Sequence, residues 1–101
     1  MSSQIILHPA VIEELQESCK WHEDRAAGLG IRFMSFVNKR LKEIAEHPER
    51  YAKKKGNYRE IKVEVFPYAI IYEVLKKEHI IFVSYIFHAK QNPSLKYRRL
   101  H

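Results

Sequence analysis

The N-terminal part of the chain has a hydrophobic pattern that predicts a strand followed by a helix. Residues 4–7 form a short apolar run typical of a β-strand, and Pro9, which lacks a backbone N–H, is suited to the first turn of a helix. Beyond Pro9, apolar positions recur at helical spacing while acidic, amide and lysine side chains fill the opposite face. The members of this first stripe are Ile12, Leu15, Cys19 and His22.

A second helical stripe follows a glycine-containing turn. Gly28 and Gly30 flank Leu29, and apolar side chains then return every three or four residues until a break before Pro48. These side chains are Phe33, Val37, Leu41 and Ile44. Because the turn is short, we expect the two helices, over about residues 9–47, to form an antiparallel hairpin.

The second half of the chain changes to the period of β-strands. After a Gly56-Asn57 turn, apolar residues alternate with charged ones, which predicts a strand with one wet face. Its apolar residues are Ile61, Val63 and Val65. Phe66-Pro67 ends this strand, and the runs 68–75 and 79–87 predict two more. Their connectors are short enough to require antiparallel neighbours.

The order of these elements defines the expected fold class. A strand, a helical hairpin and three strands with a short C-terminal tail predict an α+β protein, in which the hairpin covers one face of a three-stranded antiparallel meander. The 101 residues contain no internal repeat, linker or low-complexity tract. We therefore expect residues 1–101 to form a single domain.

Charge is distributed unevenly between the two halves. The chain carries 18 Lys and Arg against 12 Asp and Glu, a net charge of +6. Residues 1–47 contain six basic and seven acidic side chains, whereas residues 48–101 contain twelve basic and five acidic ones. The second half should therefore make any contact with a polyanion.

Composition argues against several kinds of protein. A single cysteine, Cys19, excludes an intramolecular disulfide framework and a cysteine-rich zinc site, and it suits a cytoplasmic location. No segment approaches the roughly 20 apolar residues that cross a bilayer, and the first residues lack the pattern of a signal peptide. The six histidines show no metal-binding spacing and no nucleotide-binding glycine motif is present, so we expect neither a metal nor a cofactor.

Two separated motifs resemble those of the RelE/ParE superfamily of bacterial toxins. The first is Phe66-Pro67-Tyr68-Ala69-Ile70-Ile71-Tyr72-Glu73 on the middle long strand, and the second is His88-Ala89-Lys90-Gln91-Asn92-Pro93 after the last strand. Arg59 matches the arginine that opens the first long strand in this superfamily. The order of elements also fits, and the resemblance covers nearly the whole chain.

This resemblance implies the toxin of a type II toxin–antitoxin module of the plasmid stabilisation kind, neutralised by a co-encoded antitoxin. RelE-like members cleave mRNA on the ribosome, whereas ParE-like members poison DNA gyrase without catalysis. The sequence leaves both branches open. A third interpretation, from another class, is a non-catalytic, degenerate module of the same fold that binds RNA or protein.

The resemblance also suggests candidate catalytic residues for a metal-independent mRNA endoribonuclease. Such a site needs a proton-transfer group, cations for the developing phosphate charge and a donor for the leaving oxygen. Lys62 matches a strand lysine of the RelE pattern, and Tyr97 matches its tail tyrosine. His88 is the candidate general base, as a histidine is in other members, because an imidazole titrates near neutrality.

Three positions depart from the RelE pattern. Glu60 replaces a second strand lysine, Ala69 replaces a middle-strand arginine, and Gln91 replaces an arginine after the last strand. A guanidinium stays charged and grips a phosphate with two hydrogen bonds, which alanine and glutamine cannot do. These replacements argue against RelE-type catalysis.

The remaining cations form a candidate nucleic-acid surface. Its members are Arg59, Lys90, Arg98, Arg99 and the triplet Lys53, Lys54 and Lys55. We expect the strand 59–62, the loop after the last strand and the tail to converge around His88 and Tyr97, where the cations could hold a phosphate backbone. Plainer interpretations are a structural histidine, a tail tyrosine packed on the sheet and a solvated lysine loop.

The expected partner is an acidic antitoxin. A short sheet beside an exposed helical hairpin has a free edge and apolar grooves, which suit an added strand or an amphipathic helix. The cellular target, ribosome-bound mRNA or DNA gyrase, is left open by these features.

Overall fold

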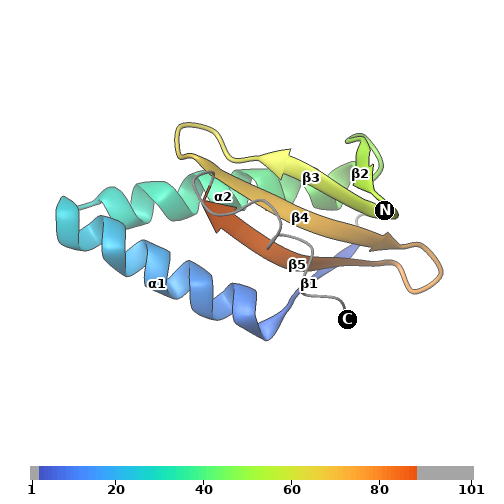
Figure 1. The fold of residues 1–101 in the computed structure, drawn as a ribbon, viewed down its shortest axis with the longest axis horizontal. Helices are drawn as coiled ribbons and strands as arrows, with labels where there is room; N and C mark the ends of the chain where they lie inside the picture. Colours follow the sequence, from blue (N-terminus) through green and yellow to red (C-terminus); the bar gives the residue numbers. More distant parts are fainter. Residues whose placement is uncertain (1–2, 89–101) are drawn as a thin grey trace.

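The computed structural model describes residues 3–88, which form a mixed sheet and two helices (Figure 1). The elements in chain order are β1 (Gln4–Leu7), α1 (Pro9–Arg25), α2 (Leu29–Glu46), β2 (Lys53–Lys55), β3 (Tyr58–Lys62), β4 (Tyr68–Leu75) and β5 (Ile80–His88). The α+β class is therefore confirmed, with the helical hairpin and the three long strands where the hydrophobic periods predict them.

The sheet contains more strands than the predicted meander. Its order in the described residues is β1-β5-β4-β3-β2, so β3, β4 and β5 are antiparallel neighbours as expected. At one edge β1 pairs parallel to β5, with Gln4 opposite Ile80, and at the other β2 pairs antiparallel to β3. The pairing satisfies backbone groups of β1 that would otherwise lack partners beside the core. The three-stranded expectation was wrong in this respect.

The two faces of the sheet are covered differently. Both helices contribute buried side chains to one large cluster that contains Phe33, Val37, Ile70 and Tyr72. Successive residues of a strand point to opposite faces, so Ile71 lies on the other face, in a smaller cluster with no helical member among the described residues. That cluster consists of Ala69, Ile71, Tyr85 and Phe87, with Tyr58 packed against it. The hairpin therefore covers one face, as predicted.

The turn between the helices differs from the expected one. Gly28, with φ of 86°, precedes α2, whereas Gly30 lies inside the helix. A Cβ at position 30 would stand 2.6 Å from the backbone oxygen of Cys19, so only glycine lets the helices approach this closely. The Glu23 carboxylate accepts hydrogen bonds from the backbone nitrogens of Gly28 and Gly30, at 2.8 and 3.0 Å, and fixes the turn.

Two hydrophobic assignments were wrong. Val65 was expected to continue the wet-faced strand, but β3 ends at Lys62, and Val65 has φ of 72° and is 65% exposed. The burial of Phe66 among aromatic rings turns the chain here. In α1 the buried stripe contains Val11 and Leu15, while Ile12 is 45% exposed.

Candidate functional site

His88 is the last residue of β5 and faces the helical side of the sheet. It pairs with Tyr68, the first residue of β4, and the two rings lie edge to face with centroids 5.1 Å apart. Directly paired residues share a face, so His88 and Tyr68 both lie on the side of α1. Together with Glu17, Ser18 and Trp21 they line a hollow of about 300 Å³, hereafter the His88 hollow.

The His88 hollow is aromatic and acidic. Glu14 joins Glu17 and His88 around an adjoining hollow of about 200 Å³, so two carboxylates from α1 stand near the imidazole. Trp21 is 51% exposed, and the guanidinium of Arg25 lies 3.9 Å from the centre of its ring. These surroundings suit a cationic or aromatic group better than a phosphate.

Behind the His88 hollow lies a second, buried histidine. The His22 ring is 4.8 Å from Phe33 and 5.0 Å from Phe66, centroid to centroid, and its Nε2 lies 3.5 Å from the Tyr68 hydroxyl. Burial is the main cause that lowers the pKa of His22, and the charges of Arg25 and His88 lower it further. His22 is therefore a neutral part of the core that supports Tyr68.

Lys62 lies on the other face of the sheet. It pairs with Ala69, which in turn pairs with Phe87, so these three side chains share the face opposite His88. Lys62 is exposed, and its backbone oxygen accepts a hydrogen bond of 2.9 Å from Arg40 Nε. Lys62 is thus close to His88 along the sheet, but the two side chains point to opposite sides.

Arg59 lies far from His88. It pairs with Tyr72, four residues along β4 from Tyr68, which corresponds to roughly 13 Å of strand. Arg59 is 8% exposed, and its Nη1 donates to the backbone oxygen of Tyr51 at 2.5 Å. The expected convergence of Arg59 with His88 does not occur. The guanidinium instead joins the end of the sheet to the chain that follows α2.

The lysine triplet forms an edge strand rather than a loop. All three residues of β2, Lys53, Lys54 and Lys55, are exposed, and the pairing with β3 is irregular between Lys53 and Lys55. This strand lies at the Arg59 end of the sheet. The other predicted site residues, Lys90, Tyr97, Arg98 and Arg99, lie outside the described residues, as does Gln91, which replaces an arginine of the RelE pattern.

An apolar groove is lined by both helices of the hairpin and by β1. It has a volume of about 560 Å³, and we call it the hairpin groove. Its apolar lining comes from β1, α1 and α2 and consists of Leu7, Ile12, Leu15, Cys19 and Met34. Charged side chains at the groove include Lys20, Glu23 and Asp24. Sequence reasoning missed this surface; the signal that could have indicated it is that Val11 and Ile12 together make the apolar stripe of α1 wider than the core buries.

The described residues contain neither a metal-binding cluster nor a helix that could span a membrane. Residues 3–88 hold no group of three or more His, Cys, Asp or Glu side chains arranged to bind a metal ion. None of the helices in the same range is long and apolar enough to cross a bilayer.

Comparisons with known proteins identify the same fold in solved structures. The chain is similar to solved structures of Escherichia coli RelE toxin, among them a double mutant in the free state, with 21% identity over 89% of this chain and 86% of that one and a TM-score of 0.67. The chain is also similar to the E. coli RelBE toxin–antitoxin complex, with 18% identity over 89% of this chain and 100% of that one and a TM-score of 0.64. The archaeal RelE–RelB complex of Pyrococcus horikoshii OT3 has 17% identity to this chain, over 91% of this chain and 100% of that one, with a TM-score of 0.55. At these identities the likeness shows the fold.

The family itself is shown by sequence. No curated protein matches the chain significantly. The model of the family described as ParE toxin of type II toxin–antitoxin system, parDE, matches residues 5–93, which is most of the chain. The resemblance to the RelE/ParE superfamily is thereby confirmed, and the chain belongs to the family of ParE toxins of type II toxin–antitoxin systems.

Proposed function

We propose that this chain arrests growth by binding DNA gyrase in the cytoplasm rather than by cleaving mRNA, and that a co-encoded acidic antitoxin neutralises it. The observation that carries the proposal is the sheet face around Ala69. Ala69 is 6% exposed and lies between Lys62 and Phe87, in the apolar cluster of that face. It stands where the RelE pattern has an arginine.

The charges on this face are unsuited to cleaving RNA. Glu60 and Glu73 lie on the same face as Lys62, because they pair with Ile71 and Tyr58 in the alternating register of β3 and β4. The described part of these two strands therefore presents one cation and two carboxylates there. A phosphodiester and its transition state need a surplus of cations.

The His88 hollow supports the same conclusion. Glu17 lines it and Glu14 lines the adjoining hollow, and both carboxylates would repel a phosphate brought to the imidazole. A protein surface presents cationic and aromatic side chains that fit this lining. A protein target therefore agrees better with the hollow than an mRNA backbone does.

The hairpin groove is the proposed antitoxin site. Solved relatives include complexes of RelE with the antitoxin RelB, and we extend this class of partner to the present chain. An amphipathic helix could fill the apolar groove, and a following extended segment could pair with β1, since Leu7 of that strand lines the groove. The net charge of +6 favours an acidic segment.

The test separates three outcomes for the chain, treated as one toxin domain over residues 1–101. We expect induced expression to arrest growth, and the purified protein to inhibit gyrase supercoiling while leaving mRNA intact in a ribosome-containing translation extract. Cleaved mRNA would show that the RNA-cleaving branch is right instead. Normal growth on induction, with neither effect in vitro, would favour the degenerate binding module and refute the proposal.

His88→Ala and Lys62→Ala sharpen this test. Both residues are candidates for RNA cleavage, and they lie on opposite faces of the sheet. If the proposal is right, Lys62→Ala retains gyrase inhibition. Circular dichroism of each variant serves as the folding control.

A further inference from the structure

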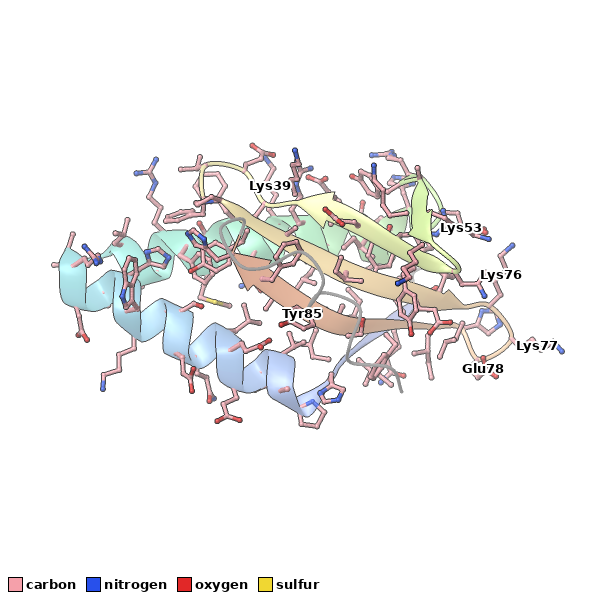
Figure 2. The ribbon with its side chains drawn as sticks, in the orientation of Figure 1. Lys39, Lys53, Lys76, Lys77, Glu78 and Tyr85 are labelled. Carbon is pink, nitrogen blue, oxygen red and sulfur yellow. The ribbon has the colours of Figure 1, made fainter. Side chains whose placement is uncertain are left out.

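Cationic side chains from an edge strand and from a separate turn gather at the end of the sheet opposite His88. Lys53 comes from β2, and Lys76 and Lys77 come from the connection between β4 and β5. Figure 2 shows these three labelled lysines at the same end of the molecule. Lys54, the middle residue of β2, is also exposed. The resemblance to the RelE/ParE superfamily assigns no role to Lys76 or Lys77.

A hollow of about 390 Å³ lies between β2 and the β4–β5 connection, and we call it the lysine hollow. Lys53, Lys76 and Lys77 stand around it together with Arg59. Arg59 is the rigid member of this set. It is 8% exposed and held by the backbone oxygen of Tyr51. Its Nε is buried without a hydrogen-bond partner in the described part of the structure.

Carboxylates also line the lysine hollow, and the carboxylate of Glu49 lies close to two of its cations. Glu49 Oε1 lies 2.8 Å from Lys76 Nζ and 3.8 Å from Arg59 Nη2. Glu73 and Glu78 are the other acids of the lining. Glu49 is half exposed, so its oxygen can be displaced by an external one. The position between Lys76 and Arg59 therefore already accepts an anionic oxygen.

We propose that the lysine hollow is a phosphate-binding surface for the backbone of duplex DNA, with Arg59 as its fixed cation and the lysines at its rim. The inference rests on the proposed function, since gyrase acts on DNA. Aromatic side chains, on which single-stranded bases stack, are absent from the described lining. A duplex hides its bases and presents phosphates, which lysines contact without regard to sequence. Duplex DNA fits this lining better than a single strand.

Salt-dependent binding tests this surface. The binding constant of the full chain for a labelled 20-base-pair DNA duplex is measured by fluorescence anisotropy between 50 and 200 mM salt. We expect the double variant Lys76→Ala/Lys77→Ala to weaken binding about tenfold and to make the slope of log K against log salt shallower by about 2, since each phosphate contact contributes about 0.9. Glu49→Gln should strengthen binding, because it removes the carboxylate that competes for Lys76.

The matched control is Lys39→Ala/Lys42→Ala, which removes the same charge from exposed positions of α2 outside both the hairpin groove and the lysine hollow. It should leave the slope unchanged. An equal loss in this control would overturn the inference, because net charge alone would then explain binding. Tighter binding to a single strand or to duplex RNA, or no binding at 50 mM salt, would also overturn it. Gyrase inhibition is measured separately, so DNA binding without inhibition would refute the proposed function and keep this surface.

Discussion

The two edges of the sheet present opposite chemistry. At one edge, β1 carries the apolar run Ile5, Ile6 and Leu7 and lies beside the hairpin groove. At the other, β2 consists of three exposed lysines and pairs irregularly with β3. Lysines and irregular pairing protect an edge strand from adding another strand. The comparison suggests that the β1 edge is suited to a protein partner and the β2 edge to an anionic one.

The largest effect on stability is expected in the helical hairpin, whose groove lies beside the β1 edge. Gly30→Ala places a Cβ 2.6 Å from the Cys19 backbone oxygen, so the helices must move apart. We expect a loss of about 2 to 3 kcal/mol in the free energy of unfolding. Urea unfolding monitored by circular dichroism measures it.

Gly56→Ala, in the turn beside β2, is the matched control. The new Cβ meets nothing within 4 Å, and only the φ of 56° is strained, at about 1 kcal/mol. If both variants lost the same free energy of unfolding, the close approach of the helices at Gly30 would be no more important for stability than the backbone strain at Gly56.

The next effect concerns partner binding at the hairpin groove. Ile12→Asp places a charge in the groove lining, and we expect affinity for the co-encoded antitoxin to fall by about 2 kcal/mol, roughly 30-fold. Isothermal titration calorimetry gives the affinity, and rescue of growth by the antitoxin gives the cellular effect. Ile31→Asp is the control: Ile31 is 76% exposed on α2 but does not line the groove. If both variants bound equally well, the groove would not be the antitoxin site.

A smaller effect is the pH dependence of stability, which we expect to come from His22 in α1 and not from Glu49 near β2. The pKa of His22 is lowered in the folded state, so the unfolded chain binds more protons once the pH falls below about 6.5. Stability should therefore fall with the pH below this value, and His22→Phe should flatten the dependence. Glu49→Gln, on the β2 side, should leave it unchanged between pH 5 and 6.5, because the pKa of Glu49 is already lowered by its hydrogen bond with Lys76. Thermal unfolding across this range measures both variants.

The smallest effect tests the protected edge itself. In Lys53→Val/Lys55→Val, β2 keeps its place but loses charges that oppose strand addition. We expect less than 0.5 kcal/mol change in the stability of the monomer and a concentration-dependent rise in self-association, seen by light scattering. A strictly monomeric variant would mean that the irregular pairing protects this edge without the lysines.

Local patterns predicted the elements of the fold better than their long-range pairing. The helical period predicted both helices, and the alternation of apolar residues predicted the three strands of the meander. The bounds of β4, Tyr68 and Leu75, were predicted correctly. The parallel pairing of β1 with β5 joins residues far apart in the sequence, so no local period reveals it. β2 was missed because lysine disfavours strands except at an exposed edge.

The candidate site was less predictable, for a related reason. His88 was identified from its motif, but Glu17 and Trp21, which line the His88 hollow, come from the first helix and carry no signal for this role in the sequence. Arg59 was found by resemblance, while its burial depends on the backbone oxygen of Tyr51, which only the folded chain brings near. Motifs identified residue types, and the register decided which face each one occupies.

The parallel pairing of β1 with β5 also has a consequence for the synthesis of the protein. Gln4 leaves the ribosome early but pairs with Ile80, 76 positions later (80 minus 4), so β1 cannot take its place until nearly the whole chain has emerged. Contacts of such high sequence separation form late and slow the folding of small domains. A nascent chain that ends before β5 therefore lacks the paired β1 strand, and if the antitoxin binds at the hairpin groove and β1 as proposed, it recognises the toxin only after β5 has been synthesised.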